Sequence, residues 1–228
     1  MPLEVRRSLV IEAAVWVFAN EGLAATTVDS VAEKAAVSKA SIYGVVRSKD
    51  ELLEVAAREE FDRFVNSLLA SQARHAQEPR LARARARFAA VFGYARERPH
   101  GFAFLIMLRD NKVGPVAALA REVRRTLTQA LASDMAVAGM ATGTVAEILA
   151  TVLIGMAEAG VRATEISPGV DADAVVDLLT GITSVGLVGL DKSILARLVP
   201  AESDATSGVA GDSSKTPSNL KQAASTQD

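Results

Sequence analysis

TVDSVAEKAAVSKASIYGVVRSKDELL, residues 27–53, holds the clearest secondary-structure signals in the chain. Thr27, Ser38 and Ser48 each precede a segment with helical spacing, and Ser and Thr hydroxyls accept hydrogen bonds from the free N–H groups of a first helical turn. Ser48 also stands three residues before Glu51, which is the spacing of a capping box. These signals predict three successive helix starts, joined by connections too short for anything but a steep crossing.

The first two predicted helices are short. The first runs from Val28 to about Ala35, with apolar residues at i, i+3, i+4 and i+7 on one face. The second runs from Lys39 to about Val46 and turns Ile42 and Val46 inward. Two such helices with a tight turn form a helix-turn-helix, whose second helix can enter the DNA major groove. We expect Lys39, Ala40, Ser41 and Tyr43 to face outward on that second helix.

Positive charge is concentrated around this motif, although the N-terminal region as a whole is not basic. Four cations and no carboxylate lie between Lys34 and Lys49, whereas residues 1–53 as a whole carry six Lys and Arg against seven Asp and Glu. Contacts to phosphate would therefore come from individual cations and helix N-termini rather than from bulk charge. Lys39 and Lys49 both stand at predicted helix starts, where backbone N–H groups also attract an anion.

A set of short motifs recurs in a fixed order: residues 11–22 (IEAAVWVFANEG), Thr26-Thr27-Val28, Val31-Ala32, Val37-Ser38-Lys39, Ile42-Tyr43 and residues 48–53 (SKDELL). On these motifs, about the first 55 residues resemble the TetR family of one-component bacterial transcription regulators. It implies a dimeric all-helical repressor with a three-helix DNA-reading head and a larger C-terminal domain for ligand binding and dimerisation. The candidate DNA-binding residues are Thr27, Ser38, Lys39, Ala40, Ser41, Tyr43 and Lys49.

The sequence departs from the family pattern in three places. Ala36 stands where the turn usually has Gly, and Val45 and Val46 replace residues that are usually aromatic or His. Gly44 lies within the predicted reading helix, where Gly costs roughly 1 kcal/mol against Ala. These departures motivate a second hypothesis, a ligand-binding module of the same fold with weak or lost DNA binding.

Composition sets the fold class and the domain division. The 228 residues are 50% hydrophobic, 23% charged and only 4% aromatic, and no strand-like alternation is sustained, so we expect an all-α protein with a real core. The predicted domains are a helix-turn-helix DNA-binding domain over 1–48 and a helical effector-binding and dimerisation domain over 49–199. Residues 200–228 are rich in small polar residues and are predicted to be a disordered tail.

The predicted location is cytoplasmic. The first ten residues, MPLEVRRSLV, lack the apolar core of a signal peptide. Apolar stretches such as residues 148–157 are shorter than the ~20 residues that span a bilayer. The absence of Cys excludes disulfides and thiolate chemistry. We expect a soluble protein with no membrane partner.

Two predicted helices, residues 144–163 and 171–190, are apolar nearly all round and must be buried on more than one side. Small residues on both would allow other helices to approach closely. We interpret residues 144–190 as a homodimer interface; an ordinary intramolecular core is the alternative. Before them we expect helices over 49–75, 80–98, 102–111 and 115–138, and after them a short helix over 192–199.

Catalytic and metal-binding motifs are missing from the sequence. His75 and His100 stand far apart, and no HExxH, GxSxG, GxxxxGK[ST] or GxGxxG occurs. We predict no enzyme activity, no metal and no cofactor, although a triad assembled in space is a third hypothesis. The segment 74–98 carries seven Arg against two Glu, which fits either a second nucleic-acid surface or a solvated helix face.

An apolar effector pocket is the predicted use of the C-terminal domain. Aromatic and Met side chains suit an adaptable, mainly hydrophobic site, and Glu158 could orient a polar group of the ligand. The candidate lining residues are Phe88, Phe92, Phe102, Phe104, Met107, Met156 and Glu158. For each residue, plain core packing or surface exposure is the alternative. The first functional hypothesis is a repressor of double-stranded operator DNA that a small hydrophobic effector releases.

Overall fold

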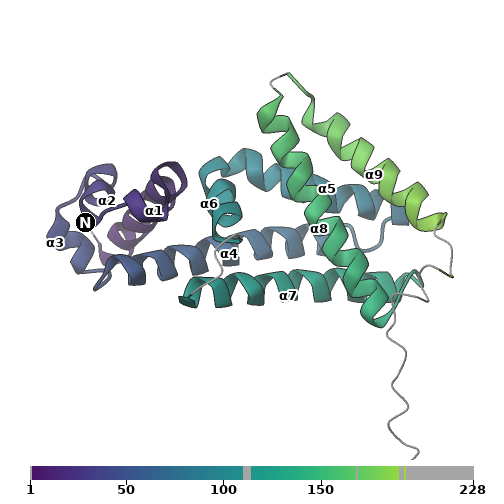
Figure 1. The fold of residues 1–228 in the computed structure, drawn as a ribbon, viewed down its shortest axis with the longest axis horizontal. Helices are drawn as coiled ribbons and strands as arrows, with labels where there is room; N and C mark the ends of the chain where they lie inside the picture. The colour runs from purple at the N-terminus through teal and green to yellow at the C-terminus, as the bar shows by residue number, and fades with distance from the viewer. Residues whose placement is uncertain (1, 110–113, 168, 190–192, 194–228) are drawn as a thin grey trace, which may run out of the picture.

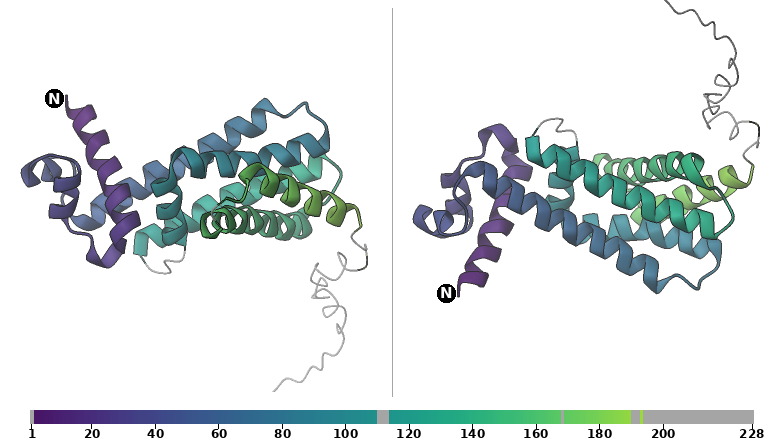
Figure 2. Two further views of the ribbon diagram at one scale, coloured as in Figure 1. Left: turned by 90° about the horizontal axis from the view of Figure 1, so that it is seen from above. Right: turned by 90° about the horizontal axis from the view of Figure 1, so that it is seen from below.

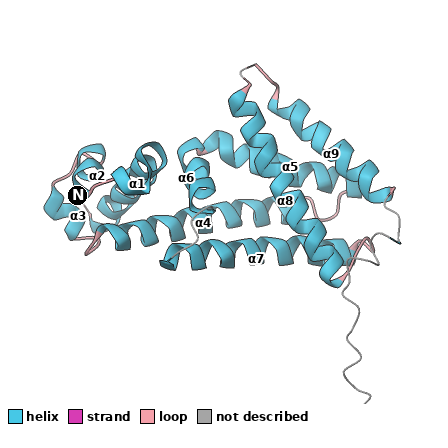
Figure 3. Ribbon diagram, viewed as in Figure 1, coloured by secondary structure: helices cyan, strands magenta, loops and turns pink. Residues whose placement is uncertain are grey.

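The structure is a computed structural model, and it describes residues 2–109, 114–167, 169–189 and 193. The regular structure of these residues is helical throughout, as the sequence predicted (Figure 3). The helices are α1 (Leu3–Ala25), α2 (Val28–Lys34), α3 (Lys39–Tyr43), α4 (Lys49–Arg74), α5 (Arg80–Glu97), α6 (Pro99–Arg109), α7 (Gly114–Val137), α8 (Gly143–Ile166) and α9 (Ala172–Val188).

Helices α1, α2 and α3 pack at one end of the molecule, around the start of α4 (Figure 1). Phe18 and Val31 are fully buried there, and Ile42 of α3 closes the same core. Gly22 interrupts α1 with a φ of +82°, a backbone conformation that favours Gly. We call α1–α3 the head and α4–α9 the body.

Side-chain caps start the three helices of residues 27–53. The hydroxyls of Thr27, Ser38 and Ser48 each accept a hydrogen bond from the backbone N–H three residues on, at 3.0, 3.2 and 3.1 Å. The Glu51 carboxylate differs from a standard capping box, because it accepts from the backbone N–H of Arg47 at 2.6 Å rather than from that of Ser48. These caps place the short helix α3 firmly between its neighbours.

The body is built on α4, which runs from the head along the length of the molecule (Figures 1 and 2). Helices α5 and α7 pack on α4, and α8 packs on both α5 and α7. Helix α6 fills the junction, since it contacts α1 of the head and α4, α5 and α7 of the body. Helix α9 covers α5 and α8 and runs back against the direction of α8.

Several predicted boundaries were wrong by a few residues. Helix α3 ends at Tyr43 rather than Val46, with Gly44 as its C-cap, because Gly is a poor helix former. Helix α6 begins at Pro99 rather than Phe102, since Pro is well tolerated at the first position of a helix. Helix α8 continues to Ile166, beyond the predicted end at 163. The predicted helix over 192–199 and the predicted tail over 200–228 lie outside the described residues, apart from Ser193.

Helices α8 and α9 present an apolar outer face. Gly160 lies on the inner side, where an added Cβ would come within 2.7 Å of Leu179 and 2.9 Å of Phe92. Gly155 and Gly181 have open space around them. The exposed large apolar residues of this pair are Ile148, Val152, Ile166, Leu178, Ile182 and Val185.

Two helices, α1 and α8, are long and apolar enough to cross a membrane by length and composition alone. The expectation that every apolar segment is too short was therefore wrong by this measure. Core helices pass the same test, and α1 buries Val10, Val17 and Phe18 against the rest of the head. Helix α8 packs against α5, α7 and α9 in the same way.

Candidate functional site

The outer face of α3 lies open to solvent. Lys39 and Ala40 are exposed, Tyr43 is 50% exposed, and Ser41 is partly covered. Ile42 between them is fully buried and fixes which side of the helix points outward. This arrangement presents a short polar face of the size that the major groove admits.

The remaining predicted DNA-binding residues flank this face at helix starts. Thr27 and Ser38 are exposed, and their hydroxyl oxygens accept the capping hydrogen bonds. The Ser38 hydroxyl also shares a hydrogen bond of 2.9 Å with the Ser41 hydroxyl. Lys49 is partly buried, and its Nζ lies 3.4 Å from the carbonyl oxygen of Ala24. The structure thus brings all seven predicted residues to α3 and the starts of α2 and α4.

Lys39 is tied to a carboxylate in this structure. Its Nζ donates to Oδ2 of Asp29 on α2 at 2.9 Å, and this hydrogen bond raises the pKa of the Lys39 ammonium. Both side chains are mostly exposed, so the pair contributes little to stability. A phosphate or base edge would have to compete with Asp29 for this ammonium group.

Arg47 is a candidate contact that the predicted set of DNA-binding residues omitted. It stands between α3 and α4, and its side chain is 92% exposed, 3.9 Å from the Glu51 carboxylate. The signal that could have found it is its place among the four cations of residues 34–49. Lys34, another of the four, instead lies 3.5 Å above the ring of Trp16, which packs at the edge of the head.

A cavity of about 700 Å³ lies in the body between α4, α5, α7, α8 and α9. Its wall is mainly apolar, with Leu68, Leu131, Met135 and Leu153 among the lining residues. Such a volume and lining are typical of a small-molecule site. Of the residues predicted from the sequence, Phe88 and Glu158 line it.

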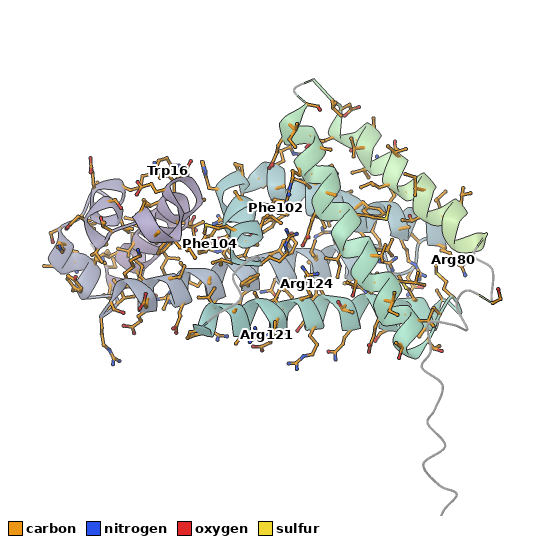
Figure 4. All side chains as sticks on the ribbon, viewed as in Figure 1. Trp16, Arg80, Phe102, Phe104, Arg121 and Arg124 are labelled. Carbon is orange, nitrogen blue, oxygen red and sulfur yellow. The ribbon has the colours of Figure 1, made fainter. Side chains whose placement is uncertain are left out.

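The other five predicted pocket residues lie outside this cavity, because they serve the packing of the junction and the core. Phe104 stacks on Phe18 of the head with ring centroids 5.8 Å apart, and Phe102 packs against Phe64 at 6.2 Å (Figure 4). Phe92 lies beneath Gly160. Met107 and Met156 pack at the edge of the same core.

Charged residues reach the cavity in two groups. Glu158 forms an ion pair with Arg109 of α6, and its second oxygen lies 4.0 Å from Arg124 of α7. The second group consists of Arg80, Arg83 and Arg87 of α5, with Asp134 of α7. The sequence analysis did not place these arginines in a pocket, although Arg83 and Arg87 stand four residues apart beside the buried Phe88.

A buried charged cluster joins the head to the body. Glu60 of α4 is 0% exposed and accepts hydrogen bonds from Arg98 at 2.8 and 2.7 Å and from the Tyr94 hydroxyl at 2.6 Å. Arg98 and Arg63 also contact Glu12 of the head helix α1, at 2.9 and 2.6 Å. One network therefore links α1, α4 and α5.

Ionisation is favoured within this cluster. Burial opposes the charge of Glu60, but the hydrogen bonds from Arg98 and Tyr94 outweigh it and hold the pKa of the carboxyl below its ordinary value. The pKa of Tyr94 is raised by burial and by the Glu60 carboxylate, so the phenol stays a donor. The cluster is an ionised, hydrogen-bonded contact at neutral pH.

Residues 10–56 match the family model described as bacterial regulatory proteins, tetR family. A TetR-like transcriptional regulator from Rhodococcus sp. RHA1 has the same fold over the body as well, with a TM-score of 0.68 and 26% identity, covering 83% of this chain and 100% of that one. The head of this chain is a TetR-family domain, and the whole chain has a TetR-like fold. The resemblance noted from the sequence is thereby confirmed.

Further TetR-like structures agree in fold. A TetR-family transcriptional regulator from Streptomyces coelicolor has a TM-score of 0.66 at 19% identity, over 87% of this chain and 90% of that one. AibR in complex with isovaleryl coenzyme A and operator DNA has a TM-score of 0.64 at 17% identity, over 78% and 97%. No curated protein matches this chain in sequence.

The comparisons bear on the question of enzyme or regulator. The family that the head matches comprises bacterial regulatory proteins, which are transcriptional regulators and not enzymes. The two His residues make separate contacts: His75 Nδ1 lies 2.7 Å from the carbonyl oxygen of Ser71, and the His100 ring packs 5.7 Å from Trp16. Within the part of the chain that the structure describes, no cluster of three His, Asp or Glu side chains could hold a metal ion.

Proposed function

We propose that this protein is a transcriptional repressor that binds operator DNA through α3 and leaves it when a mainly hydrophobic effector fills the cavity of the body. The observation that carries the proposal is the open face of α3, where Lys39, Ala40 and Tyr43 point outward above the buried Ile42. Phosphate contacts from Thr27 and Lys49, and from Arg47, would hold this face in register on the duplex.

The proposed binding unit is a homodimer formed by residues 144–190. The outer face of α8 and α9 carries exposed aliphatic side chains next to Gly155 and Gly181, which leave room for a second copy. A patch of this kind is a liability on a monomer. Pairing these faces would place two copies of α3 to meet successive major grooves, about 34–36 Å apart.

Effector release requires coupling between the cavity and the head. Helix α4 begins under the head and lines the cavity with Phe64, Leu68 and Leu69, so it reaches both sites. The Glu60 cluster and α6 connect the same helix to α1. An effector would act by binding one arrangement of the heads more tightly than the other, since its differential affinity sets the largest shift it can cause.

The structure of AibR with isovaleryl coenzyme A and operator DNA supports both halves of the proposal, because a protein of this fold was solved with a small molecule and with DNA. For the present chain, a cavity of about 700 Å³ with a mainly apolar wall supports a hydrophobic effector.

A second candidate function is a ligand-binding module with weak or lost DNA binding. It is favoured by the pairing of Lys39 with Asp29 and by the length of α3, which ends after five residues at Gly44. Both features reduce what α3 offers to a duplex.

A gel shift against the DNA upstream of the protein's own coding sequence separates the two functions. The repressor predicts a discrete complex at low and at moderate salt, and much weaker binding to a random duplex of equal length. The binding module predicts either no complex or one that disappears at moderate salt for both duplexes.

A further inference from the structure

The cavity of the body has an uneven charge distribution. Three guanidinium groups of α5 line it, those of Arg80, Arg83 and Arg87, and Asp134 is the one carboxylate paired with them, through Arg87. Glu158 does not offset them, because it is held by Arg109 and Arg124 from outside the lining. The α5 side of the cavity therefore carries an excess of positive charge among the described residues.

One hydrogen-bond donor of Arg83, in the cavity wall, has no acceptor among the described residues. Its Nε is buried without a hydrogen-bond partner among the described residues, while its Nη1 donates to the carbonyl oxygen of Ala76 at 3.4 Å. Buried donors are nearly always satisfied, so one that lines a ligand cavity calls for an acceptor from a bound molecule, either a ligand or a water. An Nε–H together with an adjacent N–H forms the fork that recognises carboxylate and phosphate groups.

The neighbouring Arg87 points to the same chemistry. Burial, together with the charge of Arg83, lowers the pKa of its guanidinium to about 10. Its partner Asp134 neutralises one charge, so the Arg83 and Arg87 pair still carries a net positive charge. An anionic group placed between the two would remove their mutual repulsion.

The rest of the wall is apolar. Leu68, Leu131, Met135, Met140, Leu149 and Leu153 line the space beyond the arginines. A ligand that fills the cavity must therefore combine a long apolar part with a charged end. Arg80 lies at the end of the body distant from the head (Figure 4).

We infer that the cavity binds an amphipathic anion, with its alkyl part among these aliphatic side chains and its oxyanion, a carboxylate or a phosphate, on Arg83 beside Arg87. This inference rests on the proposed function, because it names the chemical class of the effector. A neutral alcohol of the same length would offer Arg83 only an uncharged acceptor, and a cationic molecule would add to the positive charge, so both would bind more weakly.

The test is calorimetric titration of the full chain with four probes of one alkyl length: decanoate, decyl phosphate, decanol and decylamine. We expect decanoate or decyl phosphate to bind at least about tenfold more tightly than decanol, which corresponds to about 1.4 kcal/mol. Decylamine should bind most weakly. Comparing the two anions identifies which oxyanion the site prefers.

Two variants test whether Arg83 causes the preference for the anion over decanol. Arg83→Gln should bind the anion and decanol with similar affinity, whereas Arg96→Gln, an exposed arginine on the same helix and outside the cavity, should keep the wild-type preference. Equal or tighter binding of decanol to the wild type, or no binding of either anion, would overturn the inference. If Arg83→Gln does not fold by circular dichroism, the wild-type comparison of anion with alcohol still decides.

Failure of the inference and failure of the proposed function give different results. Should the anion bind without changing the affinity for upstream DNA, the assigned site stands and its role as effector site falls. Should DNA bind specifically while the cavity shows no preference for an oxyanion, the repressor stands and the ligand class falls.

Discussion

Arg98 Nε donates to Glu60 Oε1 at 2.8 Å, and this contact joins the end of α5 to the middle of α4 beneath the head. Arg98 Nη2 reaches Glu12 of α1 at 2.9 Å in the same cluster. The link between the head and the body is thus ionic as well as apolar, since the Phe18–Phe104 stack lies across the same junction.

Replacing Glu60 should therefore weaken the whole protein. We expect Glu60→Gln to lower the free energy of unfolding by about 3–5 kcal/mol, because it leaves Arg98 and Arg63 without a buried counter-charge. Urea unfolding at pH 7 measures the change. Glu54→Gln, an exposed carboxylate on the same helix, should change stability by less than about 0.5 kcal/mol.

The Glu60 contribution should also depend on pH. Because the folded pKa of Glu60 is lowered, its stabilisation is fully present above the unfolded value of 4.5 and is lost as the pH falls through the lower folded value. The difference in unfolding free energy between wild type and Glu60→Gln should be constant from pH 7 to about 5 and should shrink below that range. A difference that grows toward acid pH would contradict this account.

Gly101 tests how tightly α6 is packed on the same carboxylate. A Cβ at Gly101 would lie 1.9 Å from Glu60 Oε1 and 2.7 Å from its Cδ, so Gly101→Ala must displace Glu60. We expect a loss of about 1–3 kcal/mol by thermal unfolding. Gly93→Ala on α5 meets nothing within 4 Å and should instead stabilise the protein by about 0.5–1 kcal/mol.

Much of the head could be predicted from the sequence because its signals are local. The caps at Thr27, Ser38 and Ser48 and the inward position of Ile42 each depend on neighbours in the chain. Pairings over longer distances, such as Lys39 with Asp29 and Arg98 with Glu12, have no local signature.

The cavity was predicted less well for a physical reason. Aromatic residues were chosen by type, but Phe104 and Phe102 are used at the junction between head and body, where large rings fill the gap under α1. The cavity is instead lined by aliphatic side chains and by arginines such as Arg83. Which face of α5 meets the cavity depends on where α7 and α8 pack, and that is set by the whole fold.

Replacing Ala36 should raise the stability of the head. It has a φ of +52° after α2, where the Val37 N–H donates to the carbonyl of Ala32 and the Ala36 N–H to that of Glu33, the pattern of a Schellman motif. Gly adopts this conformation without the Cβ clash, but it also raises the conformational entropy of the unfolded chain, which offsets part of the gain. We expect Ala36→Gly to stabilise the head by about 0.5–1 kcal/mol net. Ala70→Gly, within α4, should cost about 1 kcal/mol in the same thermal assay.

The proposed dimer depends on the open glycine of α8. Gly155→Glu should yield a monomer or an aggregate by light scattering, because a carboxylate would be buried between the two copies. Ala118→Glu, on an exposed position of α7, should leave the dimer intact. A wild-type monomer at micromolar concentration would reject the interface.

The most direct test of the account is the salt dependence of DNA affinity. Fluorescence anisotropy with an upstream duplex and a random duplex should show tighter binding to the upstream DNA and a linear fall of log affinity with log salt. Lys49→Ala should weaken binding to both duplexes alike and reduce the slope by about one, as expected for a phosphate contact. Lys39→Ala should weaken binding as well and, if Lys39 reads a guanine edge, relax specificity at one base pair by about 1–3 kcal/mol. If neither substitution changes the affinity or the slope, α3 does not contact DNA, and the protein is a ligand-binding module rather than a repressor.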